Sequence, residues 1–132
     1  MVPNDAYALN DLGVGFEGVE RFNEALKCFS RSATLEPNHF EAHHNLGKVL
    51  LQLGNAVPAL ASFDQAVKLT PRMFEVHLRC GRALAMLERY QKSLLCFDTA
   101  VAINHNSVKA HNNRGVAFGR VMQPAKALES FL

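Results

Sequence analysis

The sequence contains no tryptophan, two tyrosines and only three cysteines in 132 residues. It also lacks the run of about 20 consecutive apolar residues that a membrane-spanning helix needs. The three cysteines, Cys28, Cys80 and Cys96, are odd in number and form no C-x-x-C pair. This pattern argues against a disulfide framework or a zinc knuckle and favours a reducing compartment. Because the first residues resemble no signal peptide, we expect a cytoplasmic protein that makes no use of a membrane.

A large excess of one sign of charge is also missing, since the formal net charge is only +2. The charges are nevertheless distributed unevenly. Residues 1–39 carry a net charge of −3, residues 40–78 are neutral, and residues 79–132 carry +5. A gradient of this kind can orient a charged ligand. Apolar residues make up 48% of the chain and charged residues 20%, which is typical of a globular domain.

Several residue types recur with a period of 34 residues. The columns are Gly13, Gly47, Gly81 and Gly115; Leu26, Leu60, Leu94 and Leu128; Phe29, Phe63, Phe97 and Phe131; and Pro3, Pro37 and Pro71. His105 takes the next proline position. A fixed period of this length indicates a repeat architecture.

Each period contains two apolar patterns with helical spacing. In the first period, Leu9, Leu12, Phe16 and Val19 lie on one side of a predicted helix, and a second helical pattern begins at Phe22. Short breaks at 20–21, 54–55 and 88–89 separate the two helices, and the proline column ends the second one. The pattern therefore predicts an all-α chain of helix–turn–helix units.

The small and aromatic columns predict how these helices pack. Glycine inside a helix costs about 1 kcal/mol relative to alanine, so its return at one spacing indicates a close helix crossing. We expect the phenylalanine column to fill the space between one helix pair and the next. Cys28 and Cys96 share a column with Ser62 and Ser130, which suggests small buried side chains rather than reactive thiols.

These columns resemble the tetratricopeptide repeat family over essentially the whole chain. The family pattern has Leu-Gly-x-x-Tyr in one helix and Ala-x-x-x-Phe in the next. Matching segments begin at Leu12, Leu46, Cys80 and Arg114 for the first part, and at Ala25, Ala59, Ser93 and Ala127 for the second. The resemblance implies a right-handed α-solenoid with repeats at 6–39, 40–73 and 74–107, an incomplete fourth at 108–132, and residues 1–5 as the tail of a preceding repeat.

Two motifs suggest chemistry, but both are better explained by packing. Residues 13–18 spell G-x-G-x-x-G, yet they lie within a helical pattern, whereas a dinucleotide site needs a strand before that motif. His43, His77 and His111 recur every 34 residues, which would place them about 9–10 Å apart, too far for one zinc ion. We interpret them as aromatic substitutes in the tryptophan position. The sequence thus predicts no enzyme active site, no metal and no cofactor.

The polar face of the first helix in each repeat is the candidate binding surface. Solenoids use the extended concave surface that such helices line. The predicted peptide-binding residues are Asn10, His44, Asn45, Lys48, Gln52, Arg79, Arg82, Lys109, Asn112, Asn113 and Arg120. Amides can pair with any peptide backbone, and arginines with carboxylates. We expect a non-catalytic scaffold for a protein or peptide partner of acidic character, with no nucleic acid.

Two subtypes of the family can be compared with this wall. Chaperone-binding members clamp a terminal carboxylate with a Lys-Asn, Asn, Lys-Arg set; Asn45 and Arg79 match it, whereas Asn10, Val14 and Glu75 do not. O-linked N-acetylglucosamine transferases carry an asparagine ladder, which Asn45 and Asn113 match but Asp11 and Arg79 do not. The alternative function is therefore the substrate-recognition arm of a larger enzyme, such as a bacterial glycosyltransferase. RNA-reading helical repeats need a regular code column, which this sequence lacks.

The ends of the sequence lead to one further expectation. The pattern of repeat four stops at Leu132, soon after Phe131, and no polar capping helix follows. The sequence therefore predicts a piece of a longer array and an uncovered apolar face. Exposed apolar faces tend to find partners, so we expect self-association through the terminal repeats, either end to end or by exchange of helices.

Overall fold

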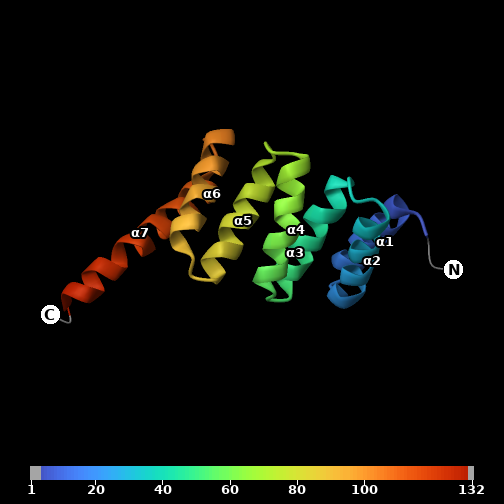
Figure 1. Cartoon of the computed structure of the whole chain (residues 1–132), viewed down its shortest axis with the longest axis horizontal. Coiled ribbons are helices and arrows are strands. Elements are labelled where there is room, and N and C mark those ends of the chain that lie inside the picture. The colour runs from blue at the N-terminus through green and yellow to red at the C-terminus, as the bar shows by residue number, and fades with distance from the viewer. Residues whose placement is uncertain (1–3, 131–132) are drawn as a thin grey trace. The chain divides into compact units, whose positions relative to one another are not determined.

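The computed structural model describes residues 4–130, and the side chains among them up to residue 122. These residues form seven α-helices and no strand, which confirms the all-α prediction. The helices are α1 (Ala6–Gly18), α2 (Phe22–Leu35), α3 (Phe40–Gln52), α4 (Ala56–Leu69), α5 (Phe74–Met86), α6 (Tyr90–Ile103) and α7 (Val108–Ser130). They divide into two compact units, of which residues 1–71 hold α1 to α4 and residues 72–132 hold α5 to α7 (Figure 1).

Three helix pairs, α1 with α2, α3 with α4 and α5 with α6, are closed by the same tight turn. The turn residues Glu20, Gly54 and Glu88 adopt left-handed backbone conformations, with φ of 61°, 82° and 58°. In the first turn the N–H of Arg21 donates to the carbonyl of Phe16 at 2.8 Å, and the other two turns repeat this bond. Such a bond satisfies a carbonyl at the helix end and reverses the chain. The breaks predicted from the sequence are thereby confirmed.

The glycine column provides the close crossing within each of these pairs. A Cβ atom built on Gly13 would lie 2.5 Å from Cε1 of Phe29, and one on Gly47 would lie 2.5 Å from Cε1 of Phe63. Gly81 stands in the same relation to Phe97. All three rings are almost fully buried. Each phenylalanine thus packs against the glycine of its own repeat, a contact that the sequence analysis did not specify.

The phenylalanines also reach the following repeat, as predicted. In the first unit, Phe29 clusters with Ala25 and with Val49 of α3. In the second unit, Phe97 clusters with Ala110 and Ala117 of α7. Each core therefore continues from one helix pair into the next within its unit.

Small polar side chains are satisfied inside these cores. The Ser32 hydroxyl donates to the Ala6 carbonyl at 2.6 Å, and the Ser93 hydroxyl donates to the Gly81 carbonyl at 2.7 Å. Buried polar groups of this kind need such partners. Cys28 is buried, which agrees with its interpretation as a small filler, whereas Cys96 of the same column is only half-buried. None of the three cysteines is in a disulfide.

The fourth repeat differs from the expectation of two helices. Helix α7 continues from Val108 to Ser130 without the turn seen in the first three repeats. The position that is left-handed at residues 20, 54 and 88 falls on Met122, which is part of the helix. Phe131, the last member of the phenylalanine column, lies outside the described residues. Among the described residues, no atom lies within 4 Å of the place where a Cβ on Gly115 would lie.

Candidate binding surface

In the first unit, the polar faces of α1 and α3 are joined by two side-chain contacts. The Asn45 amide donates to Oδ1 of Asn10 at 3.0 Å. Nζ of Lys48 lies 3.3 Å from a carboxylate oxygen of Glu17. Asn10 is only 3% exposed, so it holds Asn45 in place rather than presenting its own amide at the surface. The predicted wall of this unit is therefore already paired across the two helices.

His44 and Gln52 lie differently on this wall. The His44 ring stacks on Phe40, with ring centroids 5.8 Å apart, and lies 6.3 Å from the Phe63 ring. His44 is half-buried, whereas Gln52 is exposed at the end of α3. Gln52 is thus open to a partner, and His44 contributes mainly to packing.

The histidine column has a role that the sequence analysis missed. Nε2 of His43 lies 2.8 Å from the Pro37 carbonyl, and Nε2 of His111 lies 2.8 Å from the His105 carbonyl. Each histidine therefore ties the start of its helix to the loop six residues earlier. The 34-residue recurrence of histidine together with the proline position was the signal that could have indicated this bond.

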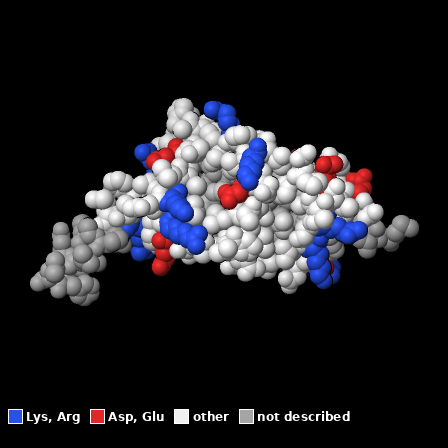
Figure 2. All heavy atoms as spheres, viewed as in Figure 1, with Lys and Arg blue, Asp and Glu red and all other residues white. Residues whose placement is uncertain are grey.

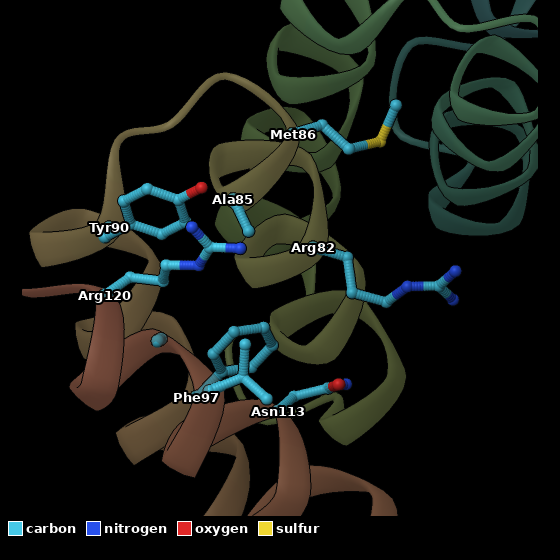
Figure 3. Close-up of a pocket in the computed structure, with 9 residues that line it drawn as sticks. Arg82, Ala85, Met86, Tyr90, Phe97, Asn113 and Arg120 are labelled. Atoms are coloured by element: carbon cyan, nitrogen blue, oxygen red, sulfur yellow. The ribbon is translucent and has the colours of Figure 1, made fainter. Parts of the chain in front are cut away.

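In the second unit, three predicted site residues come together around one pocket. The pocket has a volume of about 340 Å³ and is lined by Arg82, Ala85, Met86, Tyr90, Phe97, Asn113, Val116, Ala117 and Arg120. Figure 3 shows the Arg120 guanidinium beside the Tyr90 ring, whose centroid lies 5.8 Å from Cζ of Arg120. Arg82 and Asn113 extend in the same direction from α5 and α7 (Figure 3).

This pocket combines apolar walls with several hydrogen-bond donors. Arg82 and Arg120 are exposed, while Phe97 and Ala117 are buried in its floor. Nδ2 of Asn113 is shielded from solvent and has no acceptor among the described residues. The pocket can therefore surround a hydrocarbon chain and pair with a carboxylate or a carbonyl at its end.

The remaining predicted residues of this unit lie outside the pocket lining. Arg79 is half-buried, with its guanidinium 3.8 Å from the Glu75 carboxylate one turn earlier on α5. Lys109 and Asn112 are exposed at the start of α7. Tyr90 was missed, because the prediction considered only the first helix of each repeat and Tyr90 begins the second. The same column has Phe22 in repeat one and Ala56 in repeat two, so an aromatic residue at position 90 did not single out a site.

On the face drawn in Figure 2, the charged side chains do not form one continuous patch. The face drawn in Figure 2 shows Lys and Arg in small groups, separated by wide uncharged surface. By sequence, residues 1–71 carry a net charge of −3 and residues 72–132 carry +5. The positive charge of the chain is therefore concentrated in the unit that contains the pocket.

No three His, Cys, Asp or Glu side chains within residues 4–122 gather in a way that could hold a metal ion. Burial, and then the nearby Glu24 carboxylate, raises the pKa of the Cys28 thiol, which disfavours the reactive thiolate. None of the described helices is both long and apolar enough to cross a membrane.

Repeated helix pairs and glycine–phenylalanine crossings define a helical-repeat protein of the α-solenoid class. The tetratricopeptide repeat family model matches residues 10–73 and 58–108, so the chain belongs to the tetratricopeptide repeat family. A comparison with curated protein sequences finds no match.

Solved structures share this fold. The first TPR domain of Spaghetti (RPAP3), bound to the HSP90 peptide SRMEEVD, is 17% identical with a TM-score of 0.86, covering 91% of this chain and 96% of that one. The MamA RS-1 ArsTM double mutant is 26% identical with a TM-score of 0.86, covering 97% and 72%. The second TPR domain of human RPAP3, in complex with the HSP70 peptide SGPTIEEVD, is 19% identical with a TM-score of 0.81, covering 85% and 93%.

Proposed function

We propose that this chain is a non-catalytic interaction scaffold that binds an extended, acidic segment of a partner protein. The observation that carries the proposal is the pocket of the second unit, where Arg82, Asn113 and Arg120 surround an apolar floor. A peptide side chain with a hydrocarbon stem and a carboxylate end fits both parts of this lining. The peptides SRMEEVD and SGPTIEEVD, which occur in two of the similar structures, are acidic and support the choice of ligand.

The distribution of charge favours the second unit as the anchoring point. Lys48, the cation on the wall of the first unit, is paired with Glu17. Arg79 is paired with Glu75 on its own helix, whereas Arg82 is exposed beside the pocket. Acidic side chains of a partner therefore gain most from Arg82.

The proposed mode of binding differs from that of domains that clamp the terminal carboxylate of a peptide. Val14 and Glu75 stand where the resembling chaperone-binding domains need asparagine and lysine, and Glu75 would repel a carboxylate. We therefore expect affinity to depend on acidic side chains within the segment rather than on its C-terminus. An amidated peptide should bind as well as the free acid.

A peptide titration tests this function. Peptides selected from a random library against the chain should be enriched in Asp and Glu, and fluorescence anisotropy then measures their affinity. The double variant Arg82→Ala, Arg120→Ala should bind a selected peptide about 2–4 kcal/mol more weakly, which is at least roughly 30-fold. The matched control Lys27→Ala, Lys68→Ala removes the same charge from two exposed side chains outside the pocket lining.

Three outcomes would contradict the proposal. They are selected peptides without acidic enrichment, unchanged affinity in the Arg82 and Arg120 double variant, or an equal loss in both double variants. The last result would mean that net charge alone attracts the ligand. Competition by single-stranded RNA with a steep salt dependence would instead favour nucleic acid.

A further inference from the structure

We propose that the acidic segment carries a phosphorylated serine or threonine, whose phosphate binds in a second pocket beside Arg89 and Lys92. This inference rests on the proposed function, because the segment held in the first pocket brings the phosphate to the second. The second pocket has a volume of about 400 Å³ and lies within the second unit. Its lining comes from the turn between α5 and α6, the start of α6 and one stretch of α7: Glu88, Arg89, Tyr90, Gln91, Lys92, Arg120 and Val121.

The two pockets share one wall. Tyr90 and Arg120 line both of them. The guanidinium of Arg120 lies over the Tyr90 ring, with Cζ 5.8 Å from the ring centroid (Figure 3). This pair separates the pocket that Arg82 lines from the pocket that Arg89 and Lys92 line. An extended segment advances about 3.3 Å per residue and directs alternate side chains to one side. One segment can therefore place two nearby side chains in the two pockets.

The second pocket favours a different chemical group from the first. Met86, Phe97 and Val116 give the first pocket apolar walls that suit a hydrocarbon stem. In the second pocket, only Tyr90 and Val121 offer apolar surface, and every other lining residue is charged or carries an amide. A compact group with several hydrogen-bond acceptors gains more from such a lining than an apolar side chain does.

The charge of the lining favours a doubly charged anion. Arg89 and Lys92 are exposed, and neither forms an ion pair with a described side chain. With Arg120 they make three cations against the single anion Glu88, and the Gln91 amide adds a neutral donor. A phosphate monoester carries about −1.5 to −2 charges at pH 7 and offers three strong acceptor oxygens. A carboxylate offers one charge and two oxygens, so it satisfies this lining less completely.

Paired peptides measured by fluorescence anisotropy test the inference. The reference is a selected acidic peptide whose affinity depends on Arg82. A serine is placed in turn at positions about two to five residues on either side of its central glutamate, which covers the span of both pockets. Each peptide is made with and without phosphate. Phosphorylation should raise the affinity at least about tenfold at the position that reaches the second pocket, and much less elsewhere.

Two sets of variants assign that gain to the second pocket. The double variant Arg89→Gln, Lys92→Gln should abolish the gain from phosphate and keep the affinity for the unphosphorylated peptide within about twofold. Arg82→Ala should weaken both forms of the peptide by the same factor, since independent sites add. The matched control Lys68→Gln, Arg72→Gln also removes one lysine and one arginine charge, from exposed side chains outside both pockets, and should keep the gain. Thermal melts should be unchanged in both double variants, because all four side chains are exposed.

The results also separate this inference from the proposed function. Arg82-dependent binding with no gain from phosphate at any position overturns this inference alone. Binding that does not depend on Arg82 overturns the proposed function, and this inference with it.

Three further results would overturn the phosphate site. One is a full gain when aspartate replaces phosphoserine, because a single charge would then suffice. Another is an equal loss in the two double variants, which would reduce the effect to net charge. The third is binding of phosphoinositide vesicles through Arg89 and Lys92 without a gain for any phosphopeptide, which would assign the pocket to a membrane headgroup.

Discussion

The ring of Phe63 occupies the space where a side chain on Gly47 would begin, with only 2.5 Å between Cε1 and the position of a Gly47 Cβ atom. Phe63 is completely buried, so the ring has no solvent-filled space into which it could move. The two residues are sixteen positions apart and belong to the two helices of one repeat. Their contact explains why glycine persists inside a helix despite its unfavourable helix propensity.

Gly47→Ala should therefore destabilise the chain, although alanine is the better helix former. The added methyl group forces the Phe63 ring or the α3 backbone to shift, which costs about 1–3 kcal/mol in a packed core. The control is Gly15→Ala, at a helical position where nothing lies within 4 Å of the added Cβ. That variant should gain about 0.5–1 kcal/mol. Denaturant titrations measure both, and equal effects of the two changes would refute the close-packing explanation.

Substitutions at the left-handed turn residues should also change the free energy of unfolding in opposite directions. Glu20 and Glu88 have φ of 61° and 58°, a conformation that costs about 1–2 kcal/mol for a residue with a Cβ atom. Glu20→Gly and Glu88→Gly should each raise the free energy of unfolding by about 0.5–1 kcal/mol. Gly54→Ala, at φ of 82°, should lower it by a similar amount. Thermal melts compare the three variants, and destabilisation by both glycine substitutions would contradict the prediction.

Residue periodicity predicts the helices well because each repeat has to satisfy the same packing. The 34-residue columns place the breaks at 20–21, 54–55 and 88–89, and the structure has its turns there. The fourth turn is absent. The sequence did not predict its absence, since a periodic pattern does not show whether the backbone at Met122 becomes left-handed.

Side-chain pairing was the part of the site that the sequence did not reveal. Helical spacing places Asn10 on the polar face of α1, but its burial depends on how closely α3 approaches. Spacing likewise places Arg79 and Arg82 on one face, yet only Arg82 lines the pocket, whereas Arg79 lies beside Glu75 on its own helix. Tyr90 comes from a second helix, which a wall built only from first helices leaves out.

Because the pKa of the Cys28 thiol is raised in the folded chain, we expect the free energy of unfolding to fall at alkaline pH. Burial, followed by Glu24, raises its pKa in the folded chain above the ordinary value of 9.0. Below pH 9.0 both the folded and the unfolded chain hold the proton, so this contribution is fully present. As pH rises further, the unfolded chain releases the proton first, and the free energy of unfolding falls until the pH passes the raised pKa.

Cys28→Ala should remove that part of the alkaline decline. The measurement is a denaturant titration at several pH values on both sides of 9.0. Alkylation by iodoacetamide gives an independent test, since Cys28 should react more slowly in the folded chain than in urea. An alkaline decline of the same slope in both proteins would assign it to other groups.

Breaking the ion pair between Glu17 and Lys48 should increase the affinity for an acidic peptide. Glu17→Gln removes the carboxylate 3.3 Å from Nζ of Lys48 and leaves that cation for an acidic peptide. Both side chains are partly exposed, so stability should change by less than about 1 kcal/mol. The control is Glu24→Gln, which removes the same charge from the Arg21–Glu24 pair on α2. Affinity for an acidic peptide, measured by anisotropy, should rise about threefold or more in Glu17→Gln, and less in the control. Equal gains would show that only net charge matters and that Lys48 does not contact the ligand.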